Sequence, residues 1–256
     1  AFDGTSLYYD RCGDSKIYRI DPITAALVDV GGDGGIFDTG LALPEKPNAL
    51  AFDAKRNGLW IGAQTCNVTG MPIYFWDFDD NSVTLMFTIP FGLLNPATGA
   101  SFLGLCFTDG LAYNENDPST DADDELWFSD DVNANLGVFK ATTCPGASPC
   151  GDLVTGYDAT TVDASLGFLS GLAVGGSNLY MGNNGGGDVF RASIPALALV
   201  DTFVSADDRQ EDMECDPKTF GVEVMWVRTT PQGGANPDVI TAYEIEPKTC
   251  GLGGGG

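Results

Sequence analysis

The segment SGLAVGGSNLYMGNNGGGDVFR, residues 170–191, contains three short apolar stretches separated by turns. SGLAV, NLYMG and DVFR are composed largely of the apolar and aromatic residues that favour β-strands, and the glycines and asparagines between them favour tight turns. ALVDTFV, at residues 198–204, continues the pattern with a fourth stretch. We therefore expect four consecutive strands joined by short connections.

The same arrangement recurs along the whole chain. The first strand appears five times, as AFD (1–3), NALAFD (48–53), DGLAYN (109–114), SGLAV (170–174) and EDMECD (211–216). The second strand follows as SLYYD, GLWIGA, ELWFSDD, NLYMGNN and VEVMWVR, and the third as KIYRIDP, PIYFWDF, GVFKATT, DVFRASIP and VITAYEIEP. A fourth strand is expected in four units, at ALVDV (26–30), SVTLMFTI (82–89), DLVTGYDA (152–159) and ALVDTFV (198–204).

Four strands per unit predict an all-β fold, a single β-propeller of about five four-stranded blades whose last blade is incomplete. The units start about 41 to 61 residues apart, which is too irregular for a solenoid of fixed coil length. A stack of separate sandwiches is the alternative, but it does not require the same phrase at every unit start. The expected blades are residues 1–47, 48–108, 109–169, 170–210 and 211–250, followed by a glycine-rich tail or linker at 251–256.

The phrases KIYRIDPITAALVDVGG (16–32) and SGLAVGGSNLYMGNNGGGDVFR resemble secreted bacterial β-propeller repeats of the NHL and YVTN-like kind. In those repeats, "LY-x-ID-x-x-TGA" marks the second to fourth strands of a blade. The resemblance covers most of the chain, but the motif is short. It implies the architecture, and function must be argued from a site.

Charge and composition limit the partners. Twelve Lys and Arg against thirty-six Asp and Glu give a formal charge of −24, which disfavours nucleic acid and anionic membranes. No apolar stretch is long enough to span a membrane. The chain starts at Ala1 without Met and has seven cysteines and no histidine, so we expect a secreted, extracellular protein with disulfides. The lack of histidine also excludes Ser-His-Asp and Cys-His catalysis and His-ligated zinc.

The expected blade geometry sorts the cysteines between the two faces of the propeller. Connections from second to third strands share one face with the connectors between blades, and this connector face receives Cys12, Cys66 and Cys106. The predicted disulfides are Cys66–Cys106 on this face, and Cys144–Cys150 and Cys215–Cys250 on the other. Cys12 is then left over, either free or paired with another chain.

Two sequence features suggest modification or metal binding. Asn67-Val68-Thr69 is an N-glycosylation sequon in an expected turn. The acidic segment NENDPSTDADDE, residues 114–125, places Asp117, Asp121 and Asp123 close together in a form suited to Ca²⁺, which takes six to eight oxygen ligands. A solvated acidic loop is the alternative, because the EF-hand spacing is absent.

Polar residues open the first strands, at positions that crowd the mouth of a propeller's central channel: Asn48, Asp109, Ser170, Glu211 and Asp212. A carboxylic acid of raised pKa beside an ionised carboxylate is what glycoside hydrolysis requires. Asp109, Glu211 and Asp212 are therefore candidate catalytic residues. Acids at strand starts also commonly satisfy backbone donors or hold structural ions. The tryptophans of the second and third strands are expected in the core between sheets rather than in a sugar-binding platform.

The sequence favours a non-enzymatic, extracellular structural or adhesive propeller, because the last blade is incomplete, one cysteine is unmatched and no convergent catalytic set is evident. Such a protein would assemble with copies of itself, as a fibre or surface layer, or bind other extracellular surface components. The alternative is a metal-dependent lactonase or carbohydrate-active hydrolase with its site at the channel mouth. A lectin with one sugar site per blade is disfavoured by the unequal loops.

Overall fold

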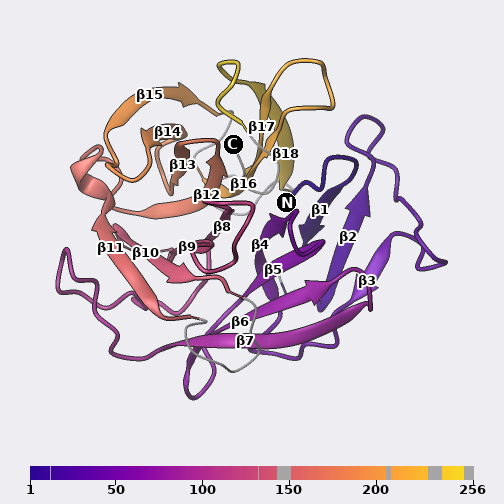
Figure 1. The fold of residues 1–256 in the computed structure, drawn as a ribbon, viewed down its shortest axis with the longest axis horizontal. Coiled ribbons are helices and arrows are strands. Elements are labelled where there is room, and N and C mark those ends of the chain that lie inside the picture. The colour runs from indigo at the N-terminus through magenta and orange to yellow at the C-terminus, as the bar shows by residue number, and fades with distance from the viewer. Residues whose placement is uncertain (12, 132, 143–150, 206–208, 230–237, 251–256) are drawn as a thin grey trace.

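The computed structural model describes residues 1–11, 13–131, 133–142, 151–205, 209–229 and 238–250. The strands form five antiparallel sheets, and each strand pairs with its neighbours in sequence. The five sheets surround a common centre as the blades of a propeller (Figure 1). The predicted all-β propeller of about five blades is thereby confirmed.

The blades contain three or four strands each. Blade 1 comprises β1 (Leu7–Asp10), β2 (Lys16–Ile20) and β3 (Ile36–Asp38). Blade 2 comprises β4 (Pro47–Asp53), β5 (Gly58–Ala63), β6 (Gly70–Asp77) and β7 (Ser82–Pro90). Blade 3 comprises β8 (Gly110–Asn114), β9 (Glu125–Ser129), β10 (Asn135–Lys140) and β11 (Leu153–Asp158), followed by the 3-10 helix η1 (Ala159–Thr161). Blade 4 comprises β12 (Leu169–Gly175), β13 (Asn178–Asn183), β14 (Asp188–Ser193) and β15 (Leu199–Val204), and blade 5 comprises β16 (Gln210–Asp216), β17 (Val224–Thr229) and β18 (Val239–Glu244).

The core lies between the faces of neighbouring blades. All four tryptophans are buried, as predicted: Trp60, Trp76, Trp127 and Trp226. Phe37 of blade 1 stacks on Trp76 of blade 2 with ring centroids 3.8 Å apart, so aromatic side chains join adjacent sheets directly. One buried apolar cluster runs from blade 1 through blade 2 into blade 3.

The expected fourth strand of blade 1 is in a different place from the one predicted. Residues 26–30 contribute only an isolated bridge between Leu27 and Ile20, and the strand that pairs with β2 is β3. Four glycines of the intervening turn have positive φ angles, at residues 31, 32, 34 and 35, which end the extended conformation after Val30. The expected first strand at residues 1–3 is likewise reduced to a bridge between Phe2 and Leu7.

Blade 5 has three described strands, and β18 pairs only with β17 within the described residues. The ring closes where blade 5 meets blade 1, a junction that we call the seam (Figure 1). A small buried cluster holds the seam together: Phe2, Leu7, Val224 and Trp226. The seam therefore has much less buried apolar surface than the junctions around blade 2.

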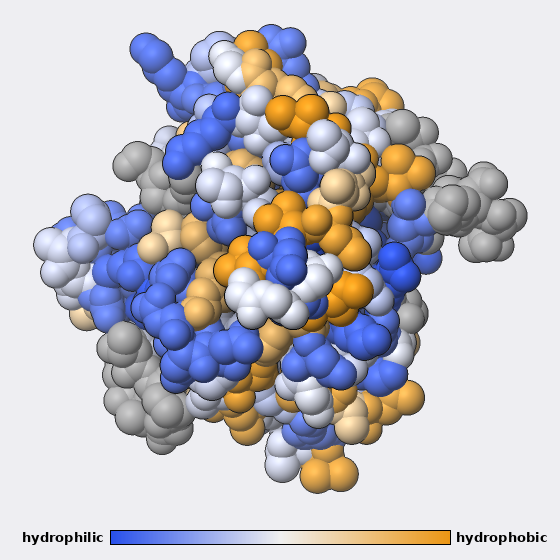
Figure 2. Space-filling view, turned by 90° about the vertical axis from the view of Figure 1, so that its right-hand side faces the viewer, coloured by the Kyte–Doolittle hydropathy of each residue, from blue (hydrophilic) through white to orange (hydrophobic). Residues whose placement is uncertain are grey.

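The surface on the side of β2 and β3 has apolar residues in its middle with hydrophilic residues around them (Figure 2). Exposed apolar residues of blade 1 include Ile23, Leu27 and Val30. Among the described residues, no helix has the length and apolar composition needed to cross a bilayer.

Candidate functional site

Three carboxyl groups from two blades converge on the connector face. Asp109 immediately precedes β8, Asp131 follows β9, and Glu211 lies in β16. First strands begin and second strands end on the same face of an antiparallel blade, which explains why these side chains meet. Asp109 is only 3% exposed and is hydrogen-bonded to Asp131. We call these three residues the channel-mouth acids.

Polar neighbours fix the channel-mouth acids in place. Ser170 Oγ lies 3.4 Å from Asp109 Oδ2 and donates to it, and the Asn184 side-chain amide donates to Asp131. Arg209 Nη2 lies 2.8 Å from Glu211 Oε1 and 4.0 Å from Asp131 Oδ1. Arg209 thus links Glu211 and Asp131, whereas Asp109 accepts a hydrogen bond from the neutral hydroxyl of Ser170.

Burial and mutual repulsion set the protonation of this group. Burial raises the pKa of Asp109 well above its ordinary value, and the nearby charges of Glu211 and Asp131 raise it further. Burial also raises the pKa of Glu211, against the lowering effect of Arg209 and Arg228. A carboxyl-to-carboxyl hydrogen bond requires one proton, and the raised pKa of Asp109 favours its protonated form. The site therefore places a proton donor beside carboxylates that are able to accept a proton.

The other predicted mouth residues have different surroundings. The regular alternation of side chains is interrupted at Glu211, which is an extra residue of β16 without a partner in β17. A register shift lies between Gln210 and Asp212, and Asp212 lines a small cavity beside Ala1 at the seam. Asn48 donates from Nδ2 to the Thr108 backbone oxygen at 2.6 Å, which ties blade 2 to the connector ahead of blade 3.

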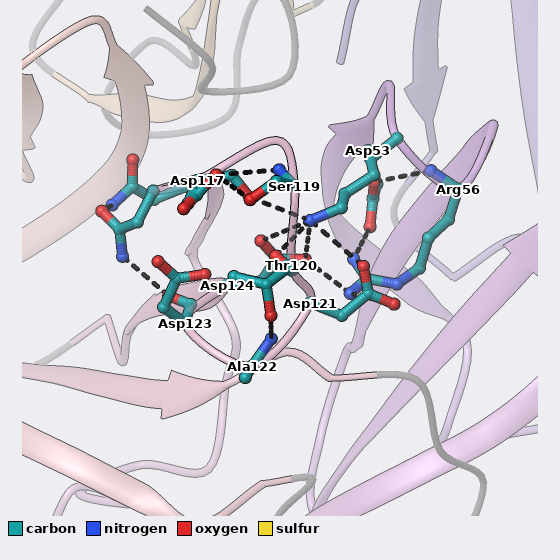
Figure 3. A network of polar contacts seen from close by, with 12 residues as sticks. Asp53, Arg56, Asp117, Ser119, Thr120, Asp121, Ala122, Asp123 and Asp124 are labelled. Atoms are coloured by element: carbon teal, nitrogen blue, oxygen red, sulfur yellow. Dashed lines mark hydrogen bonds and ion pairs between the residues drawn. The ribbon is translucent and has the colours of Figure 1, made fainter.

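The acidic segment at residues 114–125 surrounds the ammonium group of Lys55. Asp121 and Asp124 of this segment also lie beside Arg56 (Figure 3). Lys55 Nζ lies 3.1 Å from Asp121 Oδ1 and 3.3 Å from Asp124 Oδ1, and it also donates to the backbone oxygens of Asp117 and Thr120. Arg56 binds Asp124 from the other side, at 2.6 Å. The positive charge at the centre of this oxygen cluster is thus supplied by the chain itself.

The predicted calcium ligands do not converge on a common point. The Asp117 carboxylate accepts from the backbone N–H and hydroxyl of Ser119, and Asp121 faces Lys55. Asp123 has a buried oxygen, Oδ1, without a hydrogen-bond partner. Within the described residues, no group of three or more acidic or cysteine side chains is arranged to hold a metal ion. Calcium at this loop stays a prediction, and it requires that Lys55 move away.

Four of the seven cysteines lie within the described residues. Cys66 and Cys106 form a disulfide with Cα atoms 5.2 Å apart. Cys215 and Cys250 are thiols that contact one another, and burial together with this contact raises the pKa of Cys250. Cys12, Cys144 and Cys150 lie outside the described residues.

The sequon asparagine is held in a turn. Asn67 Nδ2 donates to Glu45 Oε1 at 2.8 Å, while Asn67 Oδ1 accepts from the backbone N–H and the hydroxyl of Thr69. The neighbouring Val68 is 96% exposed, so the turn itself is accessible. Glycosylation of Asn67 stays a prediction.

Sequence reasoning missed Asp131 and Arg209. A signal for Asp131 was present, because the phrase ELWFSDD carries two acids directly after a second strand, where the chain reaches the connector face. Arg209 lies one residue before β16, the first strand of blade 5. It belongs to no sequence motif that would have marked it as a site residue. Convergence of residues 109, 131 and 211 depends on the closed ring and is not visible in one repeat.

No protein-family model matches the chain, and no curated relative matches it. Among solved structures, the chain is similar to a luciferin-regenerating enzyme at 12% identity and a TM-score of 0.56, over 97% of this chain and 92% of that one. It is also similar to the WD40 repeats of RRP9, at 10% identity and a TM-score of 0.49, over 88% of this chain and 54% of that one. A structure of U3-55K gives 11% identity and a TM-score of 0.49, over 88% and 55%.

The chain thus spans about half the length of the RRP9 and U3-55K chains. At these identities the likeness shows the propeller fold alone. The attribution to secreted bacterial NHL and YVTN-like repeats stays a prediction.

Proposed function

We propose that the protein is a hydrolase whose active site is formed by the channel-mouth acids. The observation that carries this proposal is the hydrogen-bonded, buried Asp109 beside Asp131 and Glu211. Like charges buried together are unfavourable for stability, and acids whose pKa values are raised in this way cluster at functional sites. The luciferin-regenerating enzyme supports the proposal only in showing that a propeller of this size has been described as an enzyme.

The roles follow from the protonation states. Protonated Asp109 acts as the general acid that gives a proton to the leaving-group oxygen, and Glu211 acts as the general base that takes a proton from the attacking water. In the resting site this proton lies in the hydrogen bond between Asp109 and Asp131, which orients the Asp109 carboxyl group and breaks when the proton passes to the leaving-group oxygen. A formal charge of −24 disfavours anionic substrates, so the proposed substrates are neutral glycosides or lactones.

The test is hydrolysis of 4-nitrophenyl glycosides and of sugar lactones by the purified protein. Asp109→Asn removes the proton donor and is expected to lower kcat at least about 100-fold, the usual size of a general-acid contribution. Glu211→Gln is expected to do the same. Asp201→Asn is the matched control, because Asp201 is a half-exposed acid paired with Arg191 in blade 4. No turnover of either substrate class, or full activity in Asp109→Asn, would overturn the proposal.

A second candidate function is structural, and the open edge of β18 favours it. Blades 2, 3 and 4 each have a fourth strand, whereas the described part of blade 5 has none. An unpaired strand edge is a template for a strand from another molecule. In this function the protein is secreted and assembles with copies of itself or with extracellular surface components. Electron microscopy with and without a calcium chelator tests it, since ordered polymers support assembly and isolated discs under both conditions contradict it.

A further inference from the structure

The seam contains a cleft that is separate from the channel-mouth acids. The cleft has a volume of about 650 Å³ and lies between β1 and β2 on one side and β17 and β18 on the other. Its walls are largely apolar and include Leu7, Ile20, Trp226 and Ile240. Binding sites for small molecules commonly have volumes of about 300–1,000 Å³, so this cleft is large enough for a ligand.

A much smaller pocket adjoins the cleft and shares several of its residues. This pocket has a volume of about 20 Å³, which is room for about one water-sized group. Three buried acids line it: Asp10, Asp212 and Glu214. Leu7, Asp10, Trp226, Arg228 and Ile240 belong to both the pocket and the cleft, so one ligand can occupy both.

Few positive groups lie beside the three acids of this pocket. The nearby positive groups are the Ala1 amino group, which donates to the Tyr8 backbone oxygen at 3.1 Å, and Arg228. Arg228 is shared, because it lies 2.8 Å from Asp238 and 3.6 Å from Asp10 Oδ1. Arg228 is therefore the one arginine that lines both the pocket and the cleft among the described residues, and it is divided between Asp10 and Asp238, while Arg11 lines the cleft alone.

One acceptor in the pocket is unused. Asp10 Oδ2 has no hydrogen-bond partner, although the Asp10 side chain is only 2% exposed. The Asp212 carboxylate accepts from the Met213 backbone N–H at 2.9 Å, and the Glu214 carboxylate accepts from that of Cys215 at 3.1 Å. A buried acceptor without a donor is unfavourable, and a donor from outside the chain would satisfy it.

We infer that the seam binds a primary alkylammonium ligand, with the ammonium group in the acidic pocket at Asp10 and an apolar body in the cleft. A primary ammonium has three N–H donors on an atom about the size of a water molecule, which suits both the volume and the acids of the pocket. A guanidinium group is planar and larger than this space. The apolar walls of the cleft bind the rest of the ligand by excluding water from both surfaces.

The probe is 4-phenylbutylamine, and binding to the full chain is measured by isothermal titration calorimetry. The neutral analogue 4-phenylbutan-1-ol has the same apolar body without the charge, and we expect it to bind at least about 10-fold more weakly, because hydrogen bonds to charged groups are stronger than those between neutral groups. Asp10→Asn is expected to weaken amine binding by at least 10-fold and to leave alcohol binding unchanged.

A second variant tests the cleft without touching the acids. Ile240→Trp fills the cleft and is expected to abolish binding of both probes, whereas Val204→Trp places the same side chain at an exposed position of β15 and is expected to leave binding intact. Circular dichroism checks that each variant is folded. Equal affinity for the amine and the alcohol, or unchanged amine binding in folded Ile240→Trp, would overturn the inference.

Discussion

The acid that ends the first strand has the same structural task in three blades. Asp53 Oδ2 accepts from Trp60 Nε1 at 3.0 Å, Asp216 Oδ2 accepts from Trp226 Nε1 at 2.9 Å, and Asp3 Oδ2 accepts from the Tyr8 hydroxyl at 2.7 Å. In each blade the other carboxylate oxygen accepts backbone N–H groups of the following turn. The repeated phrase therefore encodes a turn and an aromatic anchor together.

Blade 3 shows what happens without this acid. Asn114 stands at the corresponding position, and the buried Nε1 of Trp127 has no hydrogen-bond partner. Asn114 instead donates to Asn116 at 2.8 Å and to Glu125 at 3.3 Å. Blade 4 also lacks the acid, because β12 ends at Gly175. The fold thus tolerates the loss of the anchor in two blades, which indicates that its contribution is energetic rather than essential for topology.

We expect Asp216→Ala to lower the free energy of unfolding by about 2–3 kcal/mol, the sum of a turn cap and a buried hydrogen bond. Urea unfolding followed by tryptophan fluorescence measures this. Asp216→Asn retains a hydrogen-bond acceptor, and we expect it to lower the free energy of unfolding by less than Asp216→Ala does. A loss below about 0.5 kcal/mol in Asp216→Ala would show that the anchor does not stabilise blade 5.

The acids of the seam make stability depend on pH. Burial raises the pKa of Asp10 to about 6 and those of Asp212 and Glu214 to about 7, despite the lowering effect of the Ala1 amino group. In the unfolded chain these groups have pKa values near 4, so the folded chain binds protons more tightly. Their favourable contribution is complete below about pH 4 and is lost as the pH rises through 6 to 7.

We therefore expect Asp212→Asn to stabilise the protein more at pH 8 than at pH 5, by at least about 1 kcal/mol, since one pKa unit corresponds to about 1.4 kcal/mol. Urea unfolding at both pH values measures the difference. The half-exposed Asp201→Asn serves as the control and should show little pH-dependent change. Parallel pH profiles for wild type and Asp212→Asn would contradict the assignment.

Strand positions could be predicted wherever apolar stretches and turns alternate plainly. All four strands of blade 2 and of blade 4 were predicted at their observed places. Blade 1 differed because the Asp21 carboxylate accepts the backbone N–H groups of residues 23 and 24 and so forms a turn. After this turn the Val28 N–H donates to the Arg19 backbone oxygen, but no continuous strand forms. The apolar residues at 26–30 look like a strand in sequence, but the glycines that follow carry the chain into another turn before β3.

The edge of blade 5 gives a prediction at the scale of one strand. Val239, at the start of β18, is 45% exposed, and a lysine on a strand edge opposes pairing with another strand. If the protein self-associates through β18, Val239→Lys should reduce the assembled fraction in sedimentation velocity at least several-fold. Val68→Lys, in the exposed turn of blade 2, is the control. Assembly that persists unchanged in Val239→Lys would place the contact elsewhere.

Across the whole molecule, the disulfide restrains the connection from blade 2 to blade 3. Cys66 and Cys106 are 40 residues apart, and closing a loop of this length in the unfolded chain contributes about 4 kcal/mol in the chain-entropy account. We expect the double variant Cys66→Ser, Cys106→Ser to unfold at correspondingly lower urea concentration under non-reducing conditions. A loss of less than about 1 kcal/mol would mean that the bond does not restrain the unfolded chain.

Only part of the candidate site could be predicted from the sequence. Asp109 and Glu211 were predicted because strand starts face the channel, which is a local rule. Asp212 was predicted with them, although it lies beyond the register shift in β16 and lines the small pocket at the seam. Asp131 and the acidic pocket depend on which blades become neighbours when the ring closes. Lys55 was not predicted either, since it reaches the acidic segment from another blade.

The seam also determines how the propeller responds to force. Neighbouring blades are joined by the chain everywhere except between blades 5 and 1, where the contacts among the described residues include the cluster of Phe2, Leu7, Val224 and Trp226. We therefore expect tension applied at Ala1 and Cys250 to separate this small apolar contact first, before the disulfide and the large cluster around blade 2 bear the force. The seam is then the mechanically weakest junction of the ring, and a ligand bound in the cleft would increase the force needed to open it.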